Sequence, residues 1–169
     1  MARIAKALSV SPVKSVVKFL LCLGLFSVVT PLVVHAQREK LSPEDVAFVE
    51  KTWPEAKKTN TGIRYIIQQP GTGEMPKPGD KVAVLYVGRL LNGTVFDQAT
   101  EKDKAFSFRV GRDQVIQGWD QVLPLMKLGD KRLVVIPAEL AYGTRGQPPK
   151  IGRNAALVFE IELIEIKRD

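Results

Sequence analysis

Residues 62–169 are predicted to form an α+β domain in which one short helix packs against an antiparallel sheet. Three observations indicate this fold class. Several runs between residues 62 and 166 alternate apolar and polar side chains with the period of two that is typical of strands. One segment, residues 114–126, places its apolar side chains at helical spacing instead. Turn signals separate the runs, and Asn92-Gly93 is a strong signal for a hairpin.

Residues 1–36 are predicted to be a secretory signal peptide that is removed from the mature chain. An apolar, uncharged run occupies residues 19–34, and Val34 and Ala36 are the small residues that a cleavage site requires. The residues before the run carry four basic side chains and no acid: Arg3, Lys6, Lys14 and Lys18. This order predicts export to the periplasm or the medium, with a mature chain that begins at Gln37.

Two alternatives to a cleaved signal are an uncleaved membrane anchor and a lipoprotein. The apolar run contains Gly24 and Pro31 and is short for a membrane span. Cys22 is a poor lipoprotein site because Leu21 before it is large and because Cys22 lies inside the apolar run. Contact with a membrane is therefore expected only through an uncleaved signal.

The composition of the mature chain excludes several classes of chemistry. The only cysteine and the only histidine, Cys22 and His35, both lie in the predicted signal. Without them a Cys or His nucleophile, a Ser-His-Asp triad and the usual zinc sites are excluded. The net charge falls from +7 to +3 when the four basic residues of 1–36 are removed, which does not predict nucleic-acid binding.

Residues 37–61 are predicted to form an N-terminal arm with one short helix. Ser42 is a good N-cap and Pro43 suits the first helical position, so the helix should run from residue 43 to about residue 52, before Pro54. The arm either docks on the domain, serves as a flexible lead-in or forms a dimerisation element. Lys57-Lys58-Thr59-Asn60 is polar and is interpreted as a linker.

The domain itself contains six predicted strands and one helix. The helix spans residues 114–126 and ends near Gly129, a C-terminal glycine signal. Glu160 and Glu162 are predicted on the face of the last strand that lies opposite its apolar residues. The predicted strands are residues 62–67, 81–91, 94–97, 106–108, 131–136 and 157–166.

Six motifs in order resemble the FKBP family of peptidyl-prolyl cis/trans isomerases over residues 62–166. Each motif is weak alone, and their order and spacing carry the resemblance. The motifs are VLYVG at 84–88, NGTVFD at 92–97, VIQGW at 115–119, MKLGDK at 126–131, IPAELAYG at 136–143 and AALVFEIEL at 155–163.

The resemblance implies a five-stranded antiparallel half-barrel wrapped around one short helix, with an aromatic pocket between helix and sheet. Trp119 would form the floor, and the backbone N–H of Ile116 would hold a substrate carbonyl. By motif position, the catalytic residues would be Asp97, Tyr142, Trp119 and Phe96. The substrate-binding residues would be Tyr86, Phe106, Val115, Ile116, Ile151 and Phe159.

The resemblance also implies an enzyme that rotates X–Pro bonds in exported or unfolded proteins and needs no metal or cofactor. Its partners would be proline-containing polypeptides and macrolide inhibitors, and we expect a monomer. The alternative is a chaperone or peptide-binding module that uses the same fold without turnover.

The chain departs from the family pattern around the pocket. Lys102 stands where many members have an arginine near the pocket aspartate, and it lacks the bidentate fork of that residue. Gln147 and Lys150 replace residues that are often His and apolar, which bears on macrolide affinity more than on catalysis. With Arg145 and Arg153, Lys150 also makes the loop after Tyr142 basic, so these charges are either solvated or favour acidic substrates.

Overall fold

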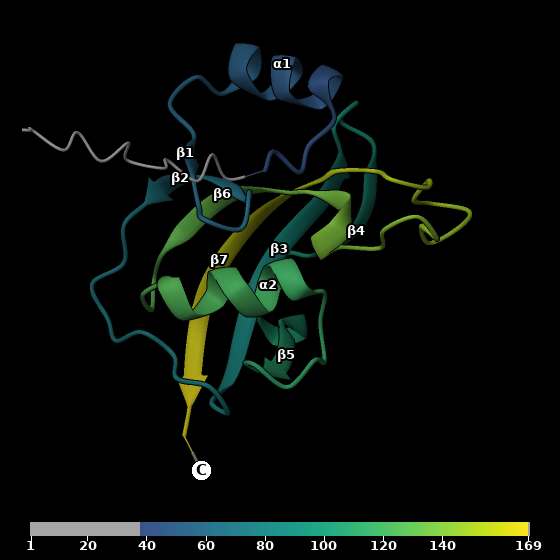
Figure 1. Cartoon of the computed structure of the whole chain (residues 1–169). Coiled ribbons are helices and arrows are strands. Elements are labelled where there is room, and N and C mark those ends of the chain that lie inside the picture. Colours follow the sequence, from purple (N-terminus) through teal and green to yellow (C-terminus); the bar gives the residue numbers. More distant parts are fainter. Residues whose placement is uncertain (1–37, 169) are drawn as a thin grey trace, which may run out of the picture. The chain divides into compact units, whose positions relative to one another are not determined.

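The computed structural model describes residues 38–168, so the predicted signal peptide and its cleavage site lie outside the described residues. The α+β fold class is confirmed (Figure 1). The elements in chain order are α1 (Pro43–Thr52), β1 (Lys57–Lys58), β2 (Arg64–Gln69), β3 (Lys81–Leu90), β4 (Val95–Ala99), the 3-10 turn η1 (Lys102–Lys104), β5 (Phe106–Arg109), α2 (Gln117–Val122), η2 (Leu123–Leu125), β6 (Lys131–Ile136), η3 (Ala138–Leu140) and β7 (Leu157–Lys167).

The described strands form one antiparallel sheet in the order β1-β2-β6-β7-β3-β4. β5 also pairs with β3, so β4 and β5 occupy the same edge of β3 one after the other, with η1 between them. Counting that edge once, the sheet has the five expected positions and one additional strand, β1. This arrangement agrees with the half-barrel that the resemblance implies.

The sheet has an apolar core on each of its two faces. Because side chains alternate along a strand, neighbouring residues of β6 point to opposite faces. Val134 and Ile136 join the larger core, which α2 covers with Trp119 and Val122. Leu133 and Val135 join a second, smaller core on the other face.

The arm covers the second core and is part of the folded domain. Ser42 caps α1 as predicted, because its Oγ accepts a hydrogen bond of 3.1 Å from the N–H of Asp45. Val49 on α1 is fully buried, and Leu41 just before α1 is 6% exposed. Both pack in the cluster that contains Val158 of β7, so the docked form of the arm is the one observed.

The linker interpretation of Lys57-Lys58-Thr59-Asn60 is wrong at its first two residues. Lys57 and Lys58 form β1, which pairs with Tyr65 and Arg64 of β2. The N–H of Thr59 then donates to the carbonyl of Ile63 at 2.8 Å, which closes the turn into β2. Lysines suit this place because a short charged edge strand resists pairing with other chains.

The helix beneath the sheet is shorter than the predicted span of residues 114–126. α2 begins at Gln117, and the chain tightens into the 3-10 turn η2 at Leu123. Pro124 explains the change, since it has no N–H to continue the α-helical hydrogen bonds. Gly118 lets α2 lie close to β6, because a Cβ there would stand 2.5 Å from Cγ2 of Ile136.

Within residues 38–168, no helix is both long enough and apolar enough to span a membrane.

Candidate active site

A cavity of about 150 Å³ lies between α2 and the sheet, where the resemblance places the pocket. β3, β4, β5, β7 and the start of α2 supply most of its wall, so residues far apart in the sequence meet here. Its lining is mostly aromatic: Tyr86, Phe96, Asp97, Phe106, Gln114, Val115, Ile116, Trp119, Tyr142 and Phe159. Nine of the ten residues predicted for the pocket are in this set.

Trp119 stands at the centre of the aromatic cluster and is 4% exposed. Its ring meets the rings of Tyr86 and Phe159 edge to face, at centroid distances of 5.0 and 5.3 Å. Phe159 meets Phe96 in the same way at 5.6 Å. Edge-to-face contacts of this kind hold the rings in fixed relative orientations, so the cavity is a preformed apolar cup.

Gly88 on β3 makes room for this cluster. A Cβ at this position would lie 2.7 Å from Cζ of Phe96 and 2.8 Å from Cε1 of Phe159. These separations are well inside van der Waals contact, so a side chain would push one of the two rings away. The glycine is therefore a packing requirement of the cup.

The polar part of the cup is a pair formed by Tyr86 and Asp97. The Tyr86 hydroxyl donates a hydrogen bond of 2.6 Å to Oδ2 of Asp97, while Oδ1 accepts one of 3.0 Å from the N–H of Gln98. Burial and this hydrogen bond raise the pKa of Tyr86 above its ordinary value. Burial, with the charge of Asp97, also raises the pKa of Tyr142. Both hydroxyls therefore stay protonated and can donate at neutral pH.

Ile116 is the residue that introduces α2. It has an extended conformation with φ of −58° and ψ of 147°, and its carbonyl accepts from the N–H of Trp119 at 2.9 Å. The first N–H groups of a helix have no partner within the helix, so this end of α2 offers donors at the cavity wall. The geometry suits the predicted role of the Ile116 N–H in holding a carbonyl.

Ile151 lies apart from the other nine predicted residues. It is 1% exposed and packs in the larger core, and it does not line the cavity. The N–H of Ile151 donates to the carbonyl of Gln147 at 3.0 Å, and the N–H of Gln147 donates to the carbonyl of Ile151 at 2.9 Å. Ile151 therefore attaches the loop after Tyr142 to the core. Gln114 was missed, because only the bend before α2 brings it to the cavity and no sequence signal marks that bend.

The loop after Tyr142 contacts β4 through Lys150. Nζ of Lys150 donates a hydrogen bond of 2.9 Å to the backbone carbonyl of Phe96. Lys102 in η1 is exposed and forms no ion pair with Asp97 within residues 38–168. The carboxylate of Asp97 is instead held by Tyr86 and by the backbone.

The cavity can bind an apolar ring and orient carbonyl groups beside it. The described residues contain no cluster of three or more side chains that could hold a metal ion. The available groups are aromatic faces, two tyrosine hydroxyls, one carboxylate and backbone donors at the start of α2. They suit recognition of an amide between an apolar ring and a preceding residue.

Comparison with known families gives one match over most of this domain. Residues 72–164 match the family described as FKBP-type peptidyl-prolyl cis-trans isomerase. The matched span includes every residue that lines the cavity.

Similar proteins occur in bacteria, fungi and animals. Human peptidyl-prolyl cis-trans isomerase FKBP4 is 46% identical over 111 residues, which cover 65% of this chain and 24% of the human protein. FK506-binding protein 1A of Aspergillus fumigatus is 41% identical over 106 residues, or 62% of this chain and 95% of the fungal protein. The chain therefore spans about a quarter of the length of the human relative and nearly all of the fungal one.

A solved structure of similar fold is a peptidyl-prolyl cis-trans isomerase from Pseudomonas syringae. It has a TM-score of 0.66 and 40% identity and covers 74% of this chain and 92% of its own. FkpA from Escherichia coli has the same TM-score and identity and covers 73% of this chain and 58% of its own.

Proposed function

Because the chain belongs to the FKBP-type peptidyl-prolyl cis-trans isomerase family, we propose that it accelerates rotation about X–Pro bonds in polypeptides. The observation that carries the proposal is the aromatic cup around Trp119, with the Tyr86–Asp97 pair in its wall. Proline lacks a backbone N–H, so its ring enters such a cup without leaving a buried donor unpaired.

The cup lowers the barrier by favouring the twisted amide over the planar one. Rotation breaks amide resonance and has a barrier of about 18–20 kcal/mol in water. The planar amide is charge-separated, and water stabilises it, whereas the twisted C–N unit is less polar. An apolar, preformed cup therefore binds the twisted state better than the planar state, and this difference in binding is the catalysis.

Individual residues hold the substrate while the bond rotates. Trp119 supports the proline ring from below, and Phe96 and Phe159 exclude water from its sides. The Ile116 N–H and the Tyr142 hydroxyl donate to substrate carbonyls, which fixes one side of the rotating bond. Asp97, held by Tyr86, places its charge near the twisting carbonyl. These roles require no covalent intermediate.

An isomerisation assay beside an aggregation assay tests the proposal against its alternative. The first follows cis-to-trans conversion of a short proline peptide, and the second follows aggregation of an unfolded protein that contains no proline. An isomerase accelerates the conversion at catalytic concentrations. A chaperone or binding module of the same fold suppresses aggregation at stoichiometric concentrations and leaves the conversion rate unchanged.

We propose that the protein is exported and that its mature form begins at Gln37. The support is the order of basic, apolar and small residues in 1–36. N-terminal sequencing of protein recovered from the periplasm or the medium tests this. Recovery of chains that retain Met1 in a membrane fraction would favour the anchor instead.

We also propose that the cup binds macrolide inhibitors, since similar proteins are named for binding FK506. The affinity for macrolides should be reduced because Lys150 places a charged side chain at the edge of the cavity, where it bonds to the Phe96 carbonyl. Titration of the isomerase activity with FK506, beside a Lys150→Ile variant that should bind more tightly, measures the effect. Sedimentation velocity tests the expected monomer.

A further inference from the structure

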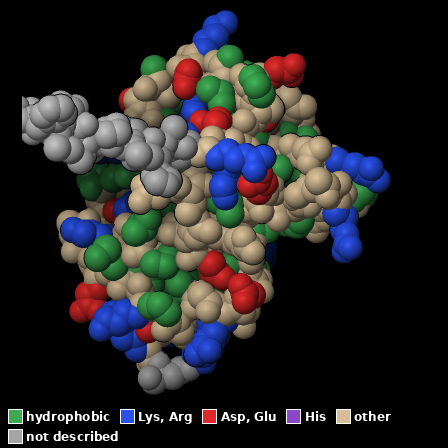
Figure 2. Space-filling view, in the orientation of Figure 1, with side chains coloured by type: hydrophobic (Ala, Val, Ile, Leu, Met, Phe, Trp, Pro, Cys, Tyr) green, Lys and Arg blue, Asp and Glu red, His purple; other side chains and the backbone are tan. Residues whose placement is uncertain are grey.

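We propose that the loop of residues 143–154, here called the basic loop, selects prolines that have acidic residues nearby in the chain. This inference rests on the proposed isomerase function and names a substrate class for the same site. The loop contains Arg145, Lys150 and Arg153 and no acidic residue. It projects from the domain in Figure 1, and basic side chains lie on the corresponding projection in Figure 2.

The two arginines are placed beside the pocket by the base of the loop. The N–H of Gly146 donates to the carbonyl of Tyr142 at 3.0 Å, so Arg145 lies in a tight turn that starts at a pocket residue. The N–H of Asn154 donates to the carbonyl of Gly143 at 2.9 Å, so Arg153 returns to the same place. Arg145 thus precedes a residue, Gly146, that is hydrogen-bonded to Tyr142. Arg153 precedes a residue, Asn154, that is hydrogen-bonded to Gly143, the neighbour of Tyr142.

The far part of the loop is attached to β4 and to the larger core. Ile151 is buried in the larger core, and Lys150 donates to the carbonyl of Phe96 on β4. The loop therefore begins at Tyr142 and is attached to β4 at Phe96, and both of these residues line the cavity. Attached at both places, it holds its charges along the edge of the cavity.

These charges are not neutralised by neighbouring acids. Arg145 and Arg153 are exposed, and neither side chain forms an ion pair or a hydrogen bond within residues 38–168. Asp97 accepts a hydrogen bond from the Tyr86 hydroxyl and forms no ion pair with either arginine, and Glu101 in the turn after β4 pairs with Lys104 at 2.6 Å. The remaining exposed charges of that turn, on Lys102 and Asp103, balance each other.

An extended substrate brings its flanking residues to these charges. A chain in extended conformation advances about 3.3–3.6 Å per residue, so a side chain two or three residues from the bound proline lies outside the cup at the rim. Ion pairs between exposed side chains are weak. Salt screens the attraction between two charges beyond about 10 Å at an ionic strength of 0.1 M and beyond about 30 Å at 0.01 M. We therefore expect a preference of about two- to fivefold at low salt that decreases as salt is added.

The test uses proline peptides that differ in one residue, Glu, Gln or Lys, at each of three positions on either side of the proline. Their kcat/KM values are measured by exchange NMR at low and at high salt with three full-length proteins. These are the wild type, a rim variant with Arg145→Gln and Arg153→Gln, and a control with Lys51→Gln and Lys57→Gln. The control removes two exposed lysines from α1 and β1, and β1 is at the edge of the sheet opposite β4.

The expected result is a Glu-to-Lys rate ratio above one at a position near the proline. This ratio should fall towards one in high salt and in the rim variant, and the control should keep it. Equal rates for Glu and Lys peptides in the low-salt wild type overturn the inference, as does a ratio that the rim variant or high salt leaves unchanged. No acceleration of the Gln peptides by the wild type overturns the proposed function itself.

Discussion

At the scale of single residues, the cup depends on the difference between aromatic side chains that line it and those that only support it. Phe96 on β4 lines the cavity and is 7% exposed. Phe108 on β5 is 4% exposed and packs on Trp119 at 5.8 Å, but it does not line the cavity. The two phenylalanines are therefore a matched pair for separating binding of substrate from stability.

Phe96→Leu is expected to lower kcat/KM for a proline peptide about tenfold, which corresponds to about 1.4 kcal/mol of binding to the twisted state. The leucine fills less of the wall and admits water to the cup. Phe108→Leu should lower the free energy of unfolding by a similar amount, about 1–3 kcal/mol, and leave kcat/KM within about twofold. Peptide kinetics and urea unfolding of both variants measure this. Equal losses of kcat/KM in the two variants would show that Phe96 contributes to substrate binding no more than Phe108 does.

The titration of the two pocket tyrosines predicts the pH dependence of the rate. The raised pKa values of Tyr86 and Tyr142 mean that both hydroxyls keep their protons beyond pH 10.0, their ordinary value. The described part of the chain has no histidine or cysteine. We expect kcat/KM to be flat between about pH 6 and 8.5. A bell-shaped profile near neutrality would show that another titrating group takes part in the reaction.

The sign of the tyrosine shift also predicts behaviour in alkali. A tyrosine with a pKa that is higher in the folded state stabilises the fold fully below pH 10. That contribution is lost as the pH rises above 10 towards the folded-state pKa. The free energy of unfolding should therefore fall above pH 10, and it should fall less steeply in Tyr86→Phe, which has no proton to lose at this position.

At the scale of elements, the strands and both ends of α1 were predicted well, whereas the ends of α2 and the short strand β1 were not. Strand periodicity located β6 at both ends, because alternation is set by burial on each face. The apolar spacing of residues 114–126 did not show that only Gln117–Val122 is α-helical, since spacing reports burial and not hydrogen bonding. The two residues of β1 carry no periodicity at all, so the sequence alone could not distinguish them from a linker.

Gly118→Ala is expected to separate α2 from β6. The added methyl would meet Cγ2 of Ile136 at 2.5 Å, so the helix must shift, and it carries the adjacent Trp119 with it. Overpacking of this kind costs about 1–3 kcal/mol of stability, and kcat/KM should fall in the variant that remains folded. Gly152→Ala is the control, because nothing lies within 4 Å of a Cβ there. A stable, fully active Gly118→Ala would show that this close approach is not required.

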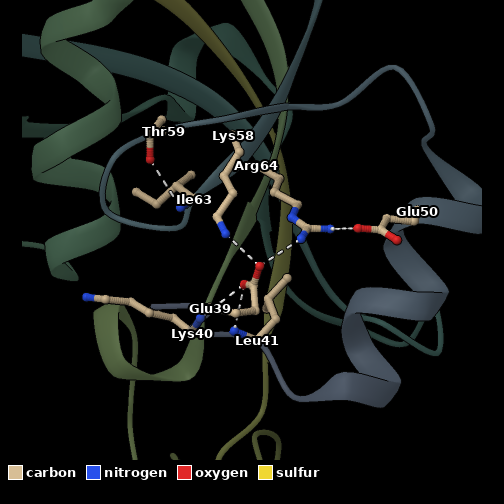
Figure 3. Close-up of polar contacts among 8 residues, drawn as sticks. All are labelled: Glu39, Lys40, Leu41, Glu50, Lys58, Thr59, Ile63 and Arg64. Atoms are coloured by element: carbon tan, nitrogen blue, oxygen red, sulfur yellow. Dashed lines mark hydrogen bonds and ion pairs between the residues drawn. The ribbon is translucent and has the colours of Figure 1, made fainter. Parts of the chain in front are cut away.

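The arm is attached to the sheet by a cluster of charges around Glu39 (Figure 3). Oε2 of Glu39 accepts from Nζ of Lys58 at 2.6 Å and from Arg64 at 3.0 Å. Arg64 is 6% exposed and also pairs with Glu50 of α1 at 3.5 Å. Burial alone would raise the pKa of Glu39, but the bonds from Lys58 and the Leu41 N–H and the charge of Arg64 lower it to about 2.

Glu39→Gln should therefore destabilise the protein in a pH-dependent way. Because the folded-state pKa of about 2 is below the ordinary 4.5, the charged form stabilises the fold above pH 4.5, and this contribution is lost as the pH falls through 2. Since Glu39 is partly exposed, we expect a loss of about 1–2 kcal/mol at pH 7 that disappears near pH 2. Urea unfolding at several pH values measures it, with Glu55→Gln as a control that should change little. A loss that is independent of pH would rule out this cluster as its cause.

At the scale of the whole molecule, one sheet separates the site from the arm. Nine of the ten residues predicted for the pocket line it. The family motifs indicate in which segment each of these residues lies and whether its side chain points into the pocket. The docking of the arm was left open, although a signal was present: Leu133, Val134, Val135 and Ile136 are consecutively apolar, which is typical of a strand covered on both faces. The sequence did not show that α1 covers the second face, because the apolar spacing of a short helix does not indicate which surface the helix packs against.

The two cores predict that stability and activity can be changed separately. Val49 is fully buried on α1 in the smaller core, whereas Val115 lines the cup on the other face. Val49→Ala leaves a cavity beneath the arm and should cost about 1–3 kcal/mol of unfolding free energy with kcat/KM unchanged. Val115→Ala enlarges the cup and should lower kcat/KM several-fold with a smaller loss of stability, because Val115 is only partly buried. Thermal unfolding and peptide kinetics on both variants test this. A fall in kcat/KM in Val49→Ala would mean that the sheet transmits changes in the arm to the cup.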